Sequence, residues 1–413
     1  MPSKYLNQGV IIRSYFLEQD DGSKKSLRRK NTRSQALSSF FWVGLPLSRT
    51  ITDMDSLLLA GLLSAGVAVL LTPVVITAAR RFGIVDRPGG RRIHALITPR
   101  LGGVAVLASF FIVFLLFLPE LSPHFKPKQL LGFSLAALLL LIVGIADDVR
   151  GIRPSLQLAS HAAAGTILVL VGMGIEEVSN PFGGKLALDQ LNVAVPIGGV
   201  DHFLTLPADL LTIAWVVLVI NAVNWLDGLD GLATGVGGIS AIALALLSVS
   251  AVVGQDHVAL LALILAGALA GFLVFNFQPA KIFLGTVGST FVGFTIATLA
   301  IISGGKVATA LLVLGFPILD ALTIILRRFR THGKFWQADT THLHHRLLAR
   351  GFSVRQSVLI VYALTASFGA LALLGGTTKS KALAFGGLVL VMLAVLAWLA
   401  RPTKEERQRQ KKI

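Results

Sequence analysis

Acidic side chains stand next to each other at one point of the chain. Asp147 and Asp148 are neighbours in the segment GIADDVRGIRPSLQ. Adjacent carboxylates repel each other, so they are best tolerated where a cation or a proton-transfer task stabilises them. A solvated helix end is the ordinary alternative for such a pair. Arg150 and Arg153, which follow, are suited to bind phosphate.

A second cluster, NAVNWLDGLDG, carries a polar residue at every third position, namely Asn221, Asn224, Asp227 and Asp230. On a helix this spacing places the side chains along one face. Amide and carboxylate oxygens suit Mg²⁺, which keeps several waters and bridges substrate phosphates, and Mn²⁺ is compatible with the same donors. A capping and turn sequence is the alternative, because Asp-Gly is a common turn signal.

Two further clusters have the composition of phosphate-binding segments. In NFQPAKIFLGTVGST, small residues precede an apolar run, so backbone N–H groups could approach a phosphate, and Lys281 adds a positive charge. A simple turn is the alternative there. DTTHLHHRL supplies imidazoles and a guanidinium that suit a diphosphate, at His342, His344, His345 and Arg346. A zinc site and a solvated basic loop are the alternatives for this segment.

The elements that must position these clusters are apolar enough to cross a membrane. Of the 413 residues, 54% are hydrophobic and 14% are charged, whereas soluble domains have about 25% charged residues. Runs of the roughly 20 residues that span a bilayer predict about eleven helices. They lie near residues 55–79, 101–119, 130–146, 156–175, 208–226, 231–253, 257–277, 288–304, 307–326, 356–376 and 381–400. The sequence therefore predicts an all-α membrane protein, a polytopic bundle of about 10–11 transmembrane helices.

The distribution of Lys and Arg predicts the orientation of this bundle. When the loops are numbered alternately, one class is rich in Lys and Arg and also contains every polar cluster, so we expect that class to be cytoplasmic. Its first loop, RRFGIVDRPGGRRIHALITPRLGG, is both a positive-inside anchor and an electropositive rim for anionic substrates. Ionisable groups near a membrane usually face a polar cavity or each other, so convergence on one side predicts one active site on the cytoplasmic face. We expect a multi-pass protein of a bacterial-type plasma membrane.

Other features limit the classes of function and the domain organisation. The chain has no cysteine, which excludes disulfides and thiolate zinc sites. Its formal net charge is +16, yet the basic residues lie in short segments, so no nucleic-acid binding is expected. We expect residues 1–53 to be an N-terminal extension, disordered or preceding the true start at Met54, followed by a polytopic domain (54–400) and a basic cytoplasmic tail (401–413). The outer loop 176–207 favours a small hairpin.

Two polar residues lie inside expected helices. Asp320, in GFPILDALT, needs a partner, which the same site could supply. His161 is a lone histidine in an apolar segment, and we interpret it as structural. Intramembrane Asp320 and the helix count are the only features that favour a transporter, because neither a repeated half nor a midplane cluster of polar groups is clear.

Taken together and in order, VDRPGGRRIHALITPRLGGVAV, GIADDVRGI, NAVNWLDGLDGL, NFQPAKIFLG and HLHHRL resemble the polyprenyl-phosphate N-acetylhexosamine-1-phosphate transferases, glycosyl transferase family 4. The resemblance runs from about residue 56 to 376 and is more similar to the branch that uses UDP-GlcNAc than to the peptidoglycan branch. It implies a magnesium-dependent enzyme that transfers N-acetylhexosamine-1-phosphate, most often GlcNAc-1-phosphate, from a UDP-N-acetylhexosamine to a polyprenyl phosphate such as undecaprenyl phosphate. UMP would be released, as the first membrane step of cell-envelope glycopolymer synthesis. A homodimer is compatible with this interpretation.

The resemblance also implies roles for individual residues. The residues implied in the reaction itself are Asp147, Asp148, Asp227 and His344, with Asp147 favoured as the base that accepts the proton of the lipid phosphate. Those implied in substrate binding are Asn221, Asn224, Asp230, Lys281, Phe283, His342, His345 and Arg346, with Asp230 and Phe283 toward the uridine. The implied metal ligands are Asn224 and Asp227, with Thr286 as a doubtful third.

Thr286 is the one departure from the family pattern. That pattern is Gly-Asp-x-Gly-Ser, and its aspartate is a principal magnesium ligand, whereas this chain has Thr286 after Gly285. A neutral hydroxyl is a poorer ligand for Mg²⁺ than a carboxylate. Two hypotheses follow: an active transferase with weakened or altered metal binding, and a catalytically impaired member that binds lipid phosphate or regulates a paralogue.

Overall fold

The computed structural model of this chain describes residues 51–86, 97–179, 184–188, 191–197, 200–250, 253–303, 313–330, 342–373 and 378–400. All of them belong to one compact unit, Leu47–Ile413. The expected N-terminal extension lies outside the described residues up to position 50, as do residues 87–96 of the first basic loop and the tail 401–413.

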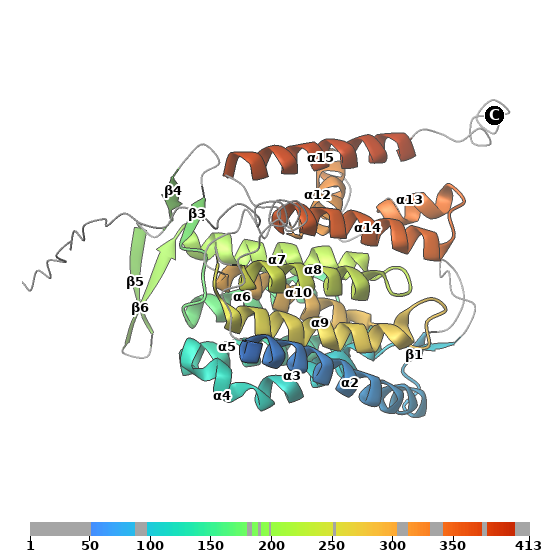
Figure 1. The fold of residues 1–413 in the computed structure, drawn as a ribbon, viewed down its shortest axis with the longest axis horizontal. Helices are drawn as coiled ribbons and strands as arrows, with labels where there is room; N and C mark the ends of the chain where they lie inside the picture. The colour runs from blue at the N-terminus through green and yellow to red at the C-terminus, as the bar shows by residue number, and fades with distance from the viewer. Residues whose placement is uncertain are drawn as a thin grey trace, which may run out of the picture. The chain divides into compact units, whose positions relative to one another are not determined.

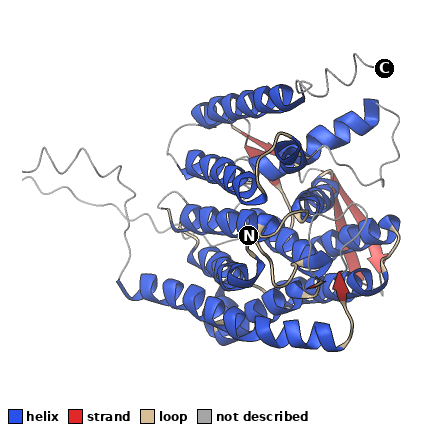
Figure 2. Cartoon of the chain, turned by 90° about the vertical axis from the view of Figure 1, so that its right-hand side faces the viewer, coloured by secondary structure: helices blue, strands red, loops and turns tan. Residues whose placement is uncertain are grey.

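Helices make up nearly all of the regular structure, as Figures 1 and 2 show. They are α2 (Ile51–Arg81), α3 (Gly102–Leu116), α4 (Leu118–Leu121), α5 (Pro127–Arg150), α6 (Pro154–Leu170), α7 (Ala208–Leu226), α8 (Leu232–Val249), α9 (Asp256–Asn276), α10 (Gly285–Ile302), α12 (Gly315–Arg330), α13 (Leu343–Ala349), α14 (Val354–Leu373) and α15 (Thr378–Ala400), with a 3-10 turn η1 (Ser122–His124). Every apolar run expected from the sequence coincides with a helix. The all-α polytopic architecture is therefore confirmed.

Fewer helices than expected are long and apolar enough to cross a membrane on their own. Among the described residues there are seven, or eight if α3 and the bent segment after it count as one span with a 69° bend. The helix α6 has only 17 residues. For α12 and α15 the comparison covers only the shorter stretches Gly315–Ile325 and Gly386–Val395.

Short antiparallel strand pairs occupy the loops. The pairs are β1 (Val85–Asp86) with β2 (Thr98–Pro99), β3 (Glu177–Ser179) with β4 (Lys185–Ala187), and β5 (Leu191–Ile197) with β6 (Val200–Leu206). The hairpin expected between residues 176 and 207 is thus present as two hairpins. These lie at the opposite end of the helices from β1 and α13 (Figure 1).

Small residues let two helices of the core approach each other closely. The helix α9 packs between α2 and α8. A Cβ on Gly267 would overlap the carbonyl oxygen of Gly61, and a Cβ on Gly271 would overlap that of Ala65. Both helices therefore place a small residue at every fourth position along their contact, a pattern typical of close packing between membrane helices.

The first turn of α10 is packed in the same way against α3 and α5. A Cβ on Gly103 of α3 would overlap the backbone of Gly288, and a Cβ on Gly144 of α5 would lie 2.7 Å from Cα of Val287. Asp148 is one helical turn beyond Gly144. The close approach of α5 therefore brings the adjacent aspartates to the N-terminus of α10.

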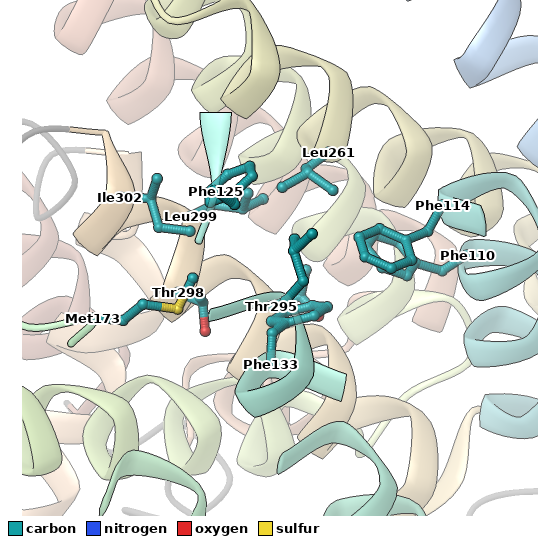
Figure 3. Close-up of a pocket in the computed structure, with 11 residues that line it drawn as sticks. Phe110, Phe114, Phe125, Phe133, Met173, Leu261, Thr295, Thr298, Leu299 and Ile302 are labelled. Atoms are coloured by element: carbon teal, nitrogen blue, oxygen red, sulfur yellow. The ribbon is translucent and has the colours of Figure 1, made fainter. Parts of the chain in front are cut away.

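A small apolar cavity lies elsewhere in the core, between α3, α5, α9 and α10 (Figure 3). Its volume is about 10 Å³, and its wall includes Phe110, Phe133 and Leu261. A cavity of this size holds at most one water molecule. It is a feature of core packing and not a substrate site.

Candidate active site

Asp148 caps the N-terminus of α10 from the end of α5. Its Oδ1 accepts the N–H of Thr286 at 2.9 Å, and its Oδ2 accepts the N–H of Val287 at 3.2 Å. The first N–H groups of a helix have no partner within the helix, and this end carries a partial positive charge that favours an anion. Gly285 has φ +72°, and a Cβ there would lie 2.6 Å from Oδ2 of Asp148. A glycine is therefore required beside this carboxylate.

Asp147, the neighbouring aspartate, is bonded to the same first turn of α10. The hydroxyl of Thr286 donates to Oδ2 of Asp147 at 2.6 Å, and the N–H of Ile152 donates to Oδ1 at 2.9 Å. Both oxygens of this carboxylate thus have a partner. The two adjacent carboxylates thus bond to different groups in the first turn of α10. Asp148 accepts backbone N–H groups, and Asp147 accepts the hydroxyl of Thr286.

Asp227 approaches the same turn from the end of α7. It is the C-cap residue of that helix. Burial and the nearby Asp148 carboxylate raise the pKa of Asp227 to about 7, against the opposing effects of the Gly285 N–H and the Arg100 guanidinium. Three carboxylates from two helices therefore meet at the first turn of α10.

The asparagines of α7 have different surroundings from each other. Asn224 Oδ1 accepts the hydroxyl of Ser289, which is one turn into α10, at 2.7 Å. Asn221 instead places its Nδ2 3.2 Å from Nδ1 of His161 on α6 and donates to the carbonyl of Val217. Asn224 is thus part of the cluster, whereas Asn221 bonds to the histidine that was interpreted as structural.

The prediction that the polar residues of NAVNWLDGLDG share one helical face is wrong beyond Leu226, where α7 ends. The segment that follows turns, and Gly231 adopts a left-handed conformation with φ +78°. Asp230 therefore leaves the helix, and its Oδ2 accepts the N–H of Ala280 at 3.0 Å. The two Asp-Gly pairs form a turn, as the alternative interpretation held, while Asp227 still lies in the cluster.

The loop between α9 and α10 is fixed by polar contacts. Asn276 donates to the carbonyl of Ile282 at 2.9 Å and accepts the hydroxyl of Thr234 at 2.6 Å. Phe283 donates its N–H to the carbonyl of Pro99. Lys281 is exposed, with Nζ 5.9 Å from the centre of the Phe275 ring. Lys281 and Phe283 are therefore on the loop that leads into the carboxylate cluster.

The histidine segment begins α13 and lies against the turn after α7. His344 is only 1% exposed, and a Cβ on Gly228 would be 2.9 Å from its Nε2. Gly228 directly follows Asp227 in the chain. His345 and Arg346 follow on the same short helix, and the rings of His344 and His345 are 4.3 Å apart. The histidine segment is thus adjacent to the acidic cluster.

Both ring nitrogens of His344 are buried, and neither has a hydrogen-bond partner among the described residues. Burial, together with the neighbouring His345 and His342, lowers the pKa of His344 well below its ordinary value. The imidazole is therefore neutral at pH 7. A buried polar group without a partner is costly, so this ring is poised to receive a hydrogen-bonding ligand.

The helix α14 holds two site loops in place. Arg355 donates through Nε and Nη2 to the carbonyl of Gln278, at 3.2 and 3.0 Å. The hydroxyl of Tyr362 donates to the carbonyl of Gly231 at 2.5 Å. One contact fixes the loop before α10 and the other fixes the turn after α7.

The donors of the cluster fit a hard divalent cation in chemistry. Among the described residues, no group of three His, Cys, Asp or Glu side chains is arranged to hold a metal ion. Mg²⁺, however, is usually bound through one or two carboxylates together with substrate phosphates and waters. Asp227 and Asn224 supply oxygen donors of that kind. Thr286 is a weaker candidate, because a neutral hydroxyl is a poorer ligand for Mg²⁺ than a carboxylate.

Three residues in or beside the site were not among the predicted site residues. The guanidinium of Arg100 is a charged neighbour of Asp227. The hydroxyl of Ser289 donates to Asn224, and Asp320 bonds to His342 of the histidine segment. Each had a signal in the sequence: a basic loop, the GTVGST segment and a carboxylate inside an apolar helix. The structure brings Asp147, Asp148, Asp227, Asn224 and Thr286 together at the start of α10 and places the histidine segment beside them, while the individual roles of the predicted residues stay predictions.

Comparison with known proteins gives consistent relatives. A family profile described as glycosyl transferase family 4 matches residues 130–304. The chain is 30% identical over 317 residues to a probable undecaprenyl-phosphate N-acetylglucosaminyl 1-phosphate transferase of Bacillus subtilis, covering 75% of this chain and 82% of that protein. It is 32% identical over 396 residues to a decaprenyl-phosphate N-acetylglucosaminephosphotransferase of Mycolicibacterium smegmatis, covering 88% and 93%. An undecaprenyl-phosphate alpha-N-acetylglucosaminyl 1-phosphate transferase of Escherichia coli is 28% identical over 312 residues, covering 71% and 78%.

Proposed function

This chain belongs to glycosyl transferase family 4, and we propose on that basis that it transfers GlcNAc-1-phosphate from UDP-GlcNAc to a polyprenyl phosphate, releasing UMP. The observation that carries the proposal is the match over most of the chain to bacterial relatives named for this transfer. The cluster of Asp147, Asp148 and Asp227 on the first turn of α10 supports it. Phosphoryl transfer requires alignment and neutralisation of charge, and such a cluster can provide both.

The lipid phosphate is handled by the two adjacent aspartates in this proposal. They lie at the end of the membrane-spanning helix α5, where the headgroup of a membrane lipid can reach. Asp148 is fixed by two backbone N–H groups, so it shapes the pocket and does not move. Asp147 accepts the Thr286 hydroxyl at Oδ2 and the Ile152 N–H at Oδ1, and exchange of the bond from Thr286 would free Oδ2 to take the proton of the lipid phosphate.

The nucleotide diphosphate is bound by the histidine segment and the turn after α7 in this proposal. In the part of the chain that the structure describes, neither buried nitrogen of His344 has a partner, and its ring lies against Gly228. His342, His345 and Arg346 surround it on the same segment. A diphosphate oxygen is the kind of partner that this ring lacks, since a neutral imidazole donates from one nitrogen.

Asp227 and Asn224 would hold a divalent cation, which we propose to be Mg²⁺. When bound, the ion would neutralise charge on the diphosphate and on the carboxylates. Asp227 must be ionised to bind it, and Asn224 is oriented by the hydroxyl of Ser289. In this proposal Asp230 and Phe283 contact the uridine, and Lys281 contacts the phosphates. All three residues lie on the loops that border the cluster.

We further propose that the site faces the cytoplasm of a bacterial cell. The end of the bundle with the acidic cluster is also the end of the loops rich in Lys and Arg, which the positive-inside rule places inside. Cysteine labelling of single-cysteine variants in intact cells tests this orientation, because the chain has no native cysteine. Labelling by a membrane-impermeant reagent at the site end, added outside the cell, would contradict it.

The transfer itself is tested with purified protein in detergent, supplied with UDP-GlcNAc, undecaprenyl phosphate and Mg²⁺. We expect release of UMP that requires the lipid and stops in the Asp227→Asn variant. UDP-GalNAc tested in parallel reveals the sugar specificity, and light scattering on the same sample reports whether the protein is a homodimer. An absence of UMP with every UDP-N-acetylhexosamine would overturn the proposal.

A further inference from the structure

Asp320 makes two hydrogen bonds to the start of the histidine segment. It lies on α12 and is 2% exposed. Its Oδ2 is 2.7 Å from Nδ1 of His342, and its Oδ1 accepts the N–H of Leu343 at 3.1 Å. A carboxylate within an apolar helix thus has its partners in a segment more than twenty residues later in the chain.

This arrangement determines which nitrogen of His342 carries hydrogen. An ionised carboxylate can only accept, so Nδ1 of the ring must be the donor. Nε2 is then the nitrogen left for a ligand, and the carboxylate also stabilises positive charge on the ring. Because Asp320 bonds the ring and the first N–H of α13 together, it fixes both the orientation of the imidazole and its place at the helix start.

The ring of His342 is in turn part of the histidine cluster. It stacks on the ring of His344 with centroids 5.3 Å apart and an interplanar angle of 15°. Its centroid lies 6.4 Å from that of the His345 ring and 6.2 Å from that of the Trp225 ring. Within the described ranges, the groups that face His342 are therefore Asp320, these two imidazoles and an indole. A tilt of His342 would displace His344, which rests on Gly228 beside the acidic cluster.

We infer that Asp320 is a positioning residue for the transfer: it accepts Nδ1–H of His342 and so supports the doubly protonated ring, which takes a proton from solvent when the substrate binds and donates Nε2–H to the diphosphate. This inference rests on the proposed function. In this doubly protonated ring Nδ1–H bonds to the carboxylate and Nε2–H bonds to a phosphate oxygen, and such charge-assisted bonds are roughly twice as strong as neutral ones. Asp320 acts through His342 and contacts no substrate.

A double-mutant cycle tests whether Asp320 acts through His342. We expect Asp320→Asn to lower kcat by about 10²-fold, the scale of general acid–base and orienting contributions, with a smaller change in KM. In a His342→Gln background, the same Asp320→Asn change should alter kcat by less than about twofold, because the group it positions is gone. Additive losses in the double variant would overturn the inference.

Asp209→Asn is the matched control. Asp209 is also a buried aspartate, 9% exposed, and its Oδ2 accepts the N–H of Thr205 at 2.7 Å. It lies at the start of α7, the end of that helix remote from the cluster. We expect kcat of Asp209→Asn to stay within about twofold of the native value. A loss of kcat in Asp320→Asn no larger than in this control would also overturn the inference.

Histidine ¹⁵N NMR of the full-length protein without substrate gives a test that does not depend on activity. The signal of His342, identified by its absence in His342→Gln, should report hydrogen on Nδ1. In Asp320→Asn the side-chain amide can donate to Nδ1, so we expect hydrogen to move to Nε2, as in a triad whose aspartate is replaced. Hydrogen on Nε2 alone in the native protein would refute the inference. Should the native protein release no UMP, the proposed function would fall, and the NMR result would still decide what Asp320 does to the ring.

Discussion

The hydroxyl of Thr286 donates a 2.6 Å hydrogen bond to Oδ2 of Asp147, a residue 139 positions earlier in the chain. The bond joins the first turn of α10 to the end of α5. It lies where the family pattern has an aspartate. In this chain the cluster therefore contains a neutral donor to one carboxylate in place of a further negative charge, and in the proposed Mg²⁺ site fewer ionised groups would hold the cation.

Replacing Thr286 by aspartate should change metal binding more than folding. A carboxylate at this position would repel Asp147 and Asp148, so we expect Thr286→Asp to melt at a lower temperature in EDTA and to regain stability when Mg²⁺ is added. The Mg²⁺ concentration that half-activates UMP release should fall by about tenfold or more. The control is Thr286→Ser, which keeps the hydroxyl and should resemble the native protein. An unchanged Mg²⁺ requirement in Thr286→Asp would contradict the prediction, and a large gain in turnover would show that threonine impairs the native site.

The raised pKa of Asp227 predicts a pH dependence of stability. The pKa moves from 3.8 to about 7, so between these values the folded protein keeps a proton that the unfolded chain has released. The stability that this proton provides is fully present below pH 3.8 and is lost as pH rises through about 7. We therefore expect Asp227→Asn to melt at a higher temperature than the native protein at pH 8 without divalent ions, with the gap closing as pH falls. Melting curves from about pH 5 to 8 measure this, and a gap that widens toward acid would contradict it.

The same pKa predicts the direction of metal binding. Only the ionised form of Asp227 can bind Mg²⁺, so the ion should bind more tightly as pH rises through about 7. At a subsaturating Mg²⁺ concentration we expect the increase in melting temperature caused by Mg²⁺ to be larger at pH 8 than at pH 6. Asp227→Asn should show little increase at either pH. An Mg²⁺ effect that is independent of pH would argue against Asp227 as the ligand.

Gly285 and Gly254 offer a matched pair for testing the turn beside Asp148. Both have positive φ, +72° and +60°, but a Cβ on Gly285 would meet the Asp148 carboxylate at 2.6 Å while one on Gly254 meets nothing within 4 Å. Gly254→Ala should therefore show only the backbone strain, about 1–2 kcal/mol, and keep its activity. Gly285→Ala should lose more stability and should lower UMP release by about tenfold or more, because it displaces Asp148. Equal effects of the two substitutions would show that the contact with Asp148 is unimportant.

The contact between α2 and α9 predicts a difference between two other glycines. A Cβ on Gly267 would overlap the Gly61 carbonyl, whereas one on Gly66 of α2 meets nothing within 4 Å. We expect Gly267→Ala to force these helices apart and to lower the melting temperature by several degrees, on the scale of about 1–3 kcal/mol for overpacking. Gly66→Ala should be neutral or stabilising, since alanine is favoured over glycine in helices by about 1 kcal/mol. The melting temperatures in one detergent decide between these outcomes.

Much of the fold could be predicted from local sequence because membrane helices depend on local composition. The apolar runs located every long helix, and the Asp-Asp pair was expected at a helix end, where α5 does end two residues later. The expected helix 208–226 ends where α7 does, but the three-residue spacing favoured one helical face that would include Asp230. The helix stops at Leu226 because the glycines of the two Asp-Gly pairs favour a turn, and local spacing did not weigh one signal against the other.

The partners of the polar residues could not be predicted in the same way. Asn221 bonds to His161, Asp320 bonds to His342, and Thr286 bonds to Asp147. Each pair joins different helices, or a helix and a later segment, so the contact depends on how the helices pack. A lone polar residue in an apolar run indicates that a partner exists, and it does not indicate which of the other elements supplies that partner.

Arg355 and Tyr362 tie α14 to both loops beside the carboxylates, although α14 contains none of the predicted site residues. The helix α14 therefore stabilises a site whose residues come from earlier parts of the chain. A fragment trimmed to residues 130–304, the part that matches the family profile, would keep the acidic residues but lose both the histidines and this support. A portion that keeps the histidines and both of these contacts must therefore extend into α14 beyond Tyr362.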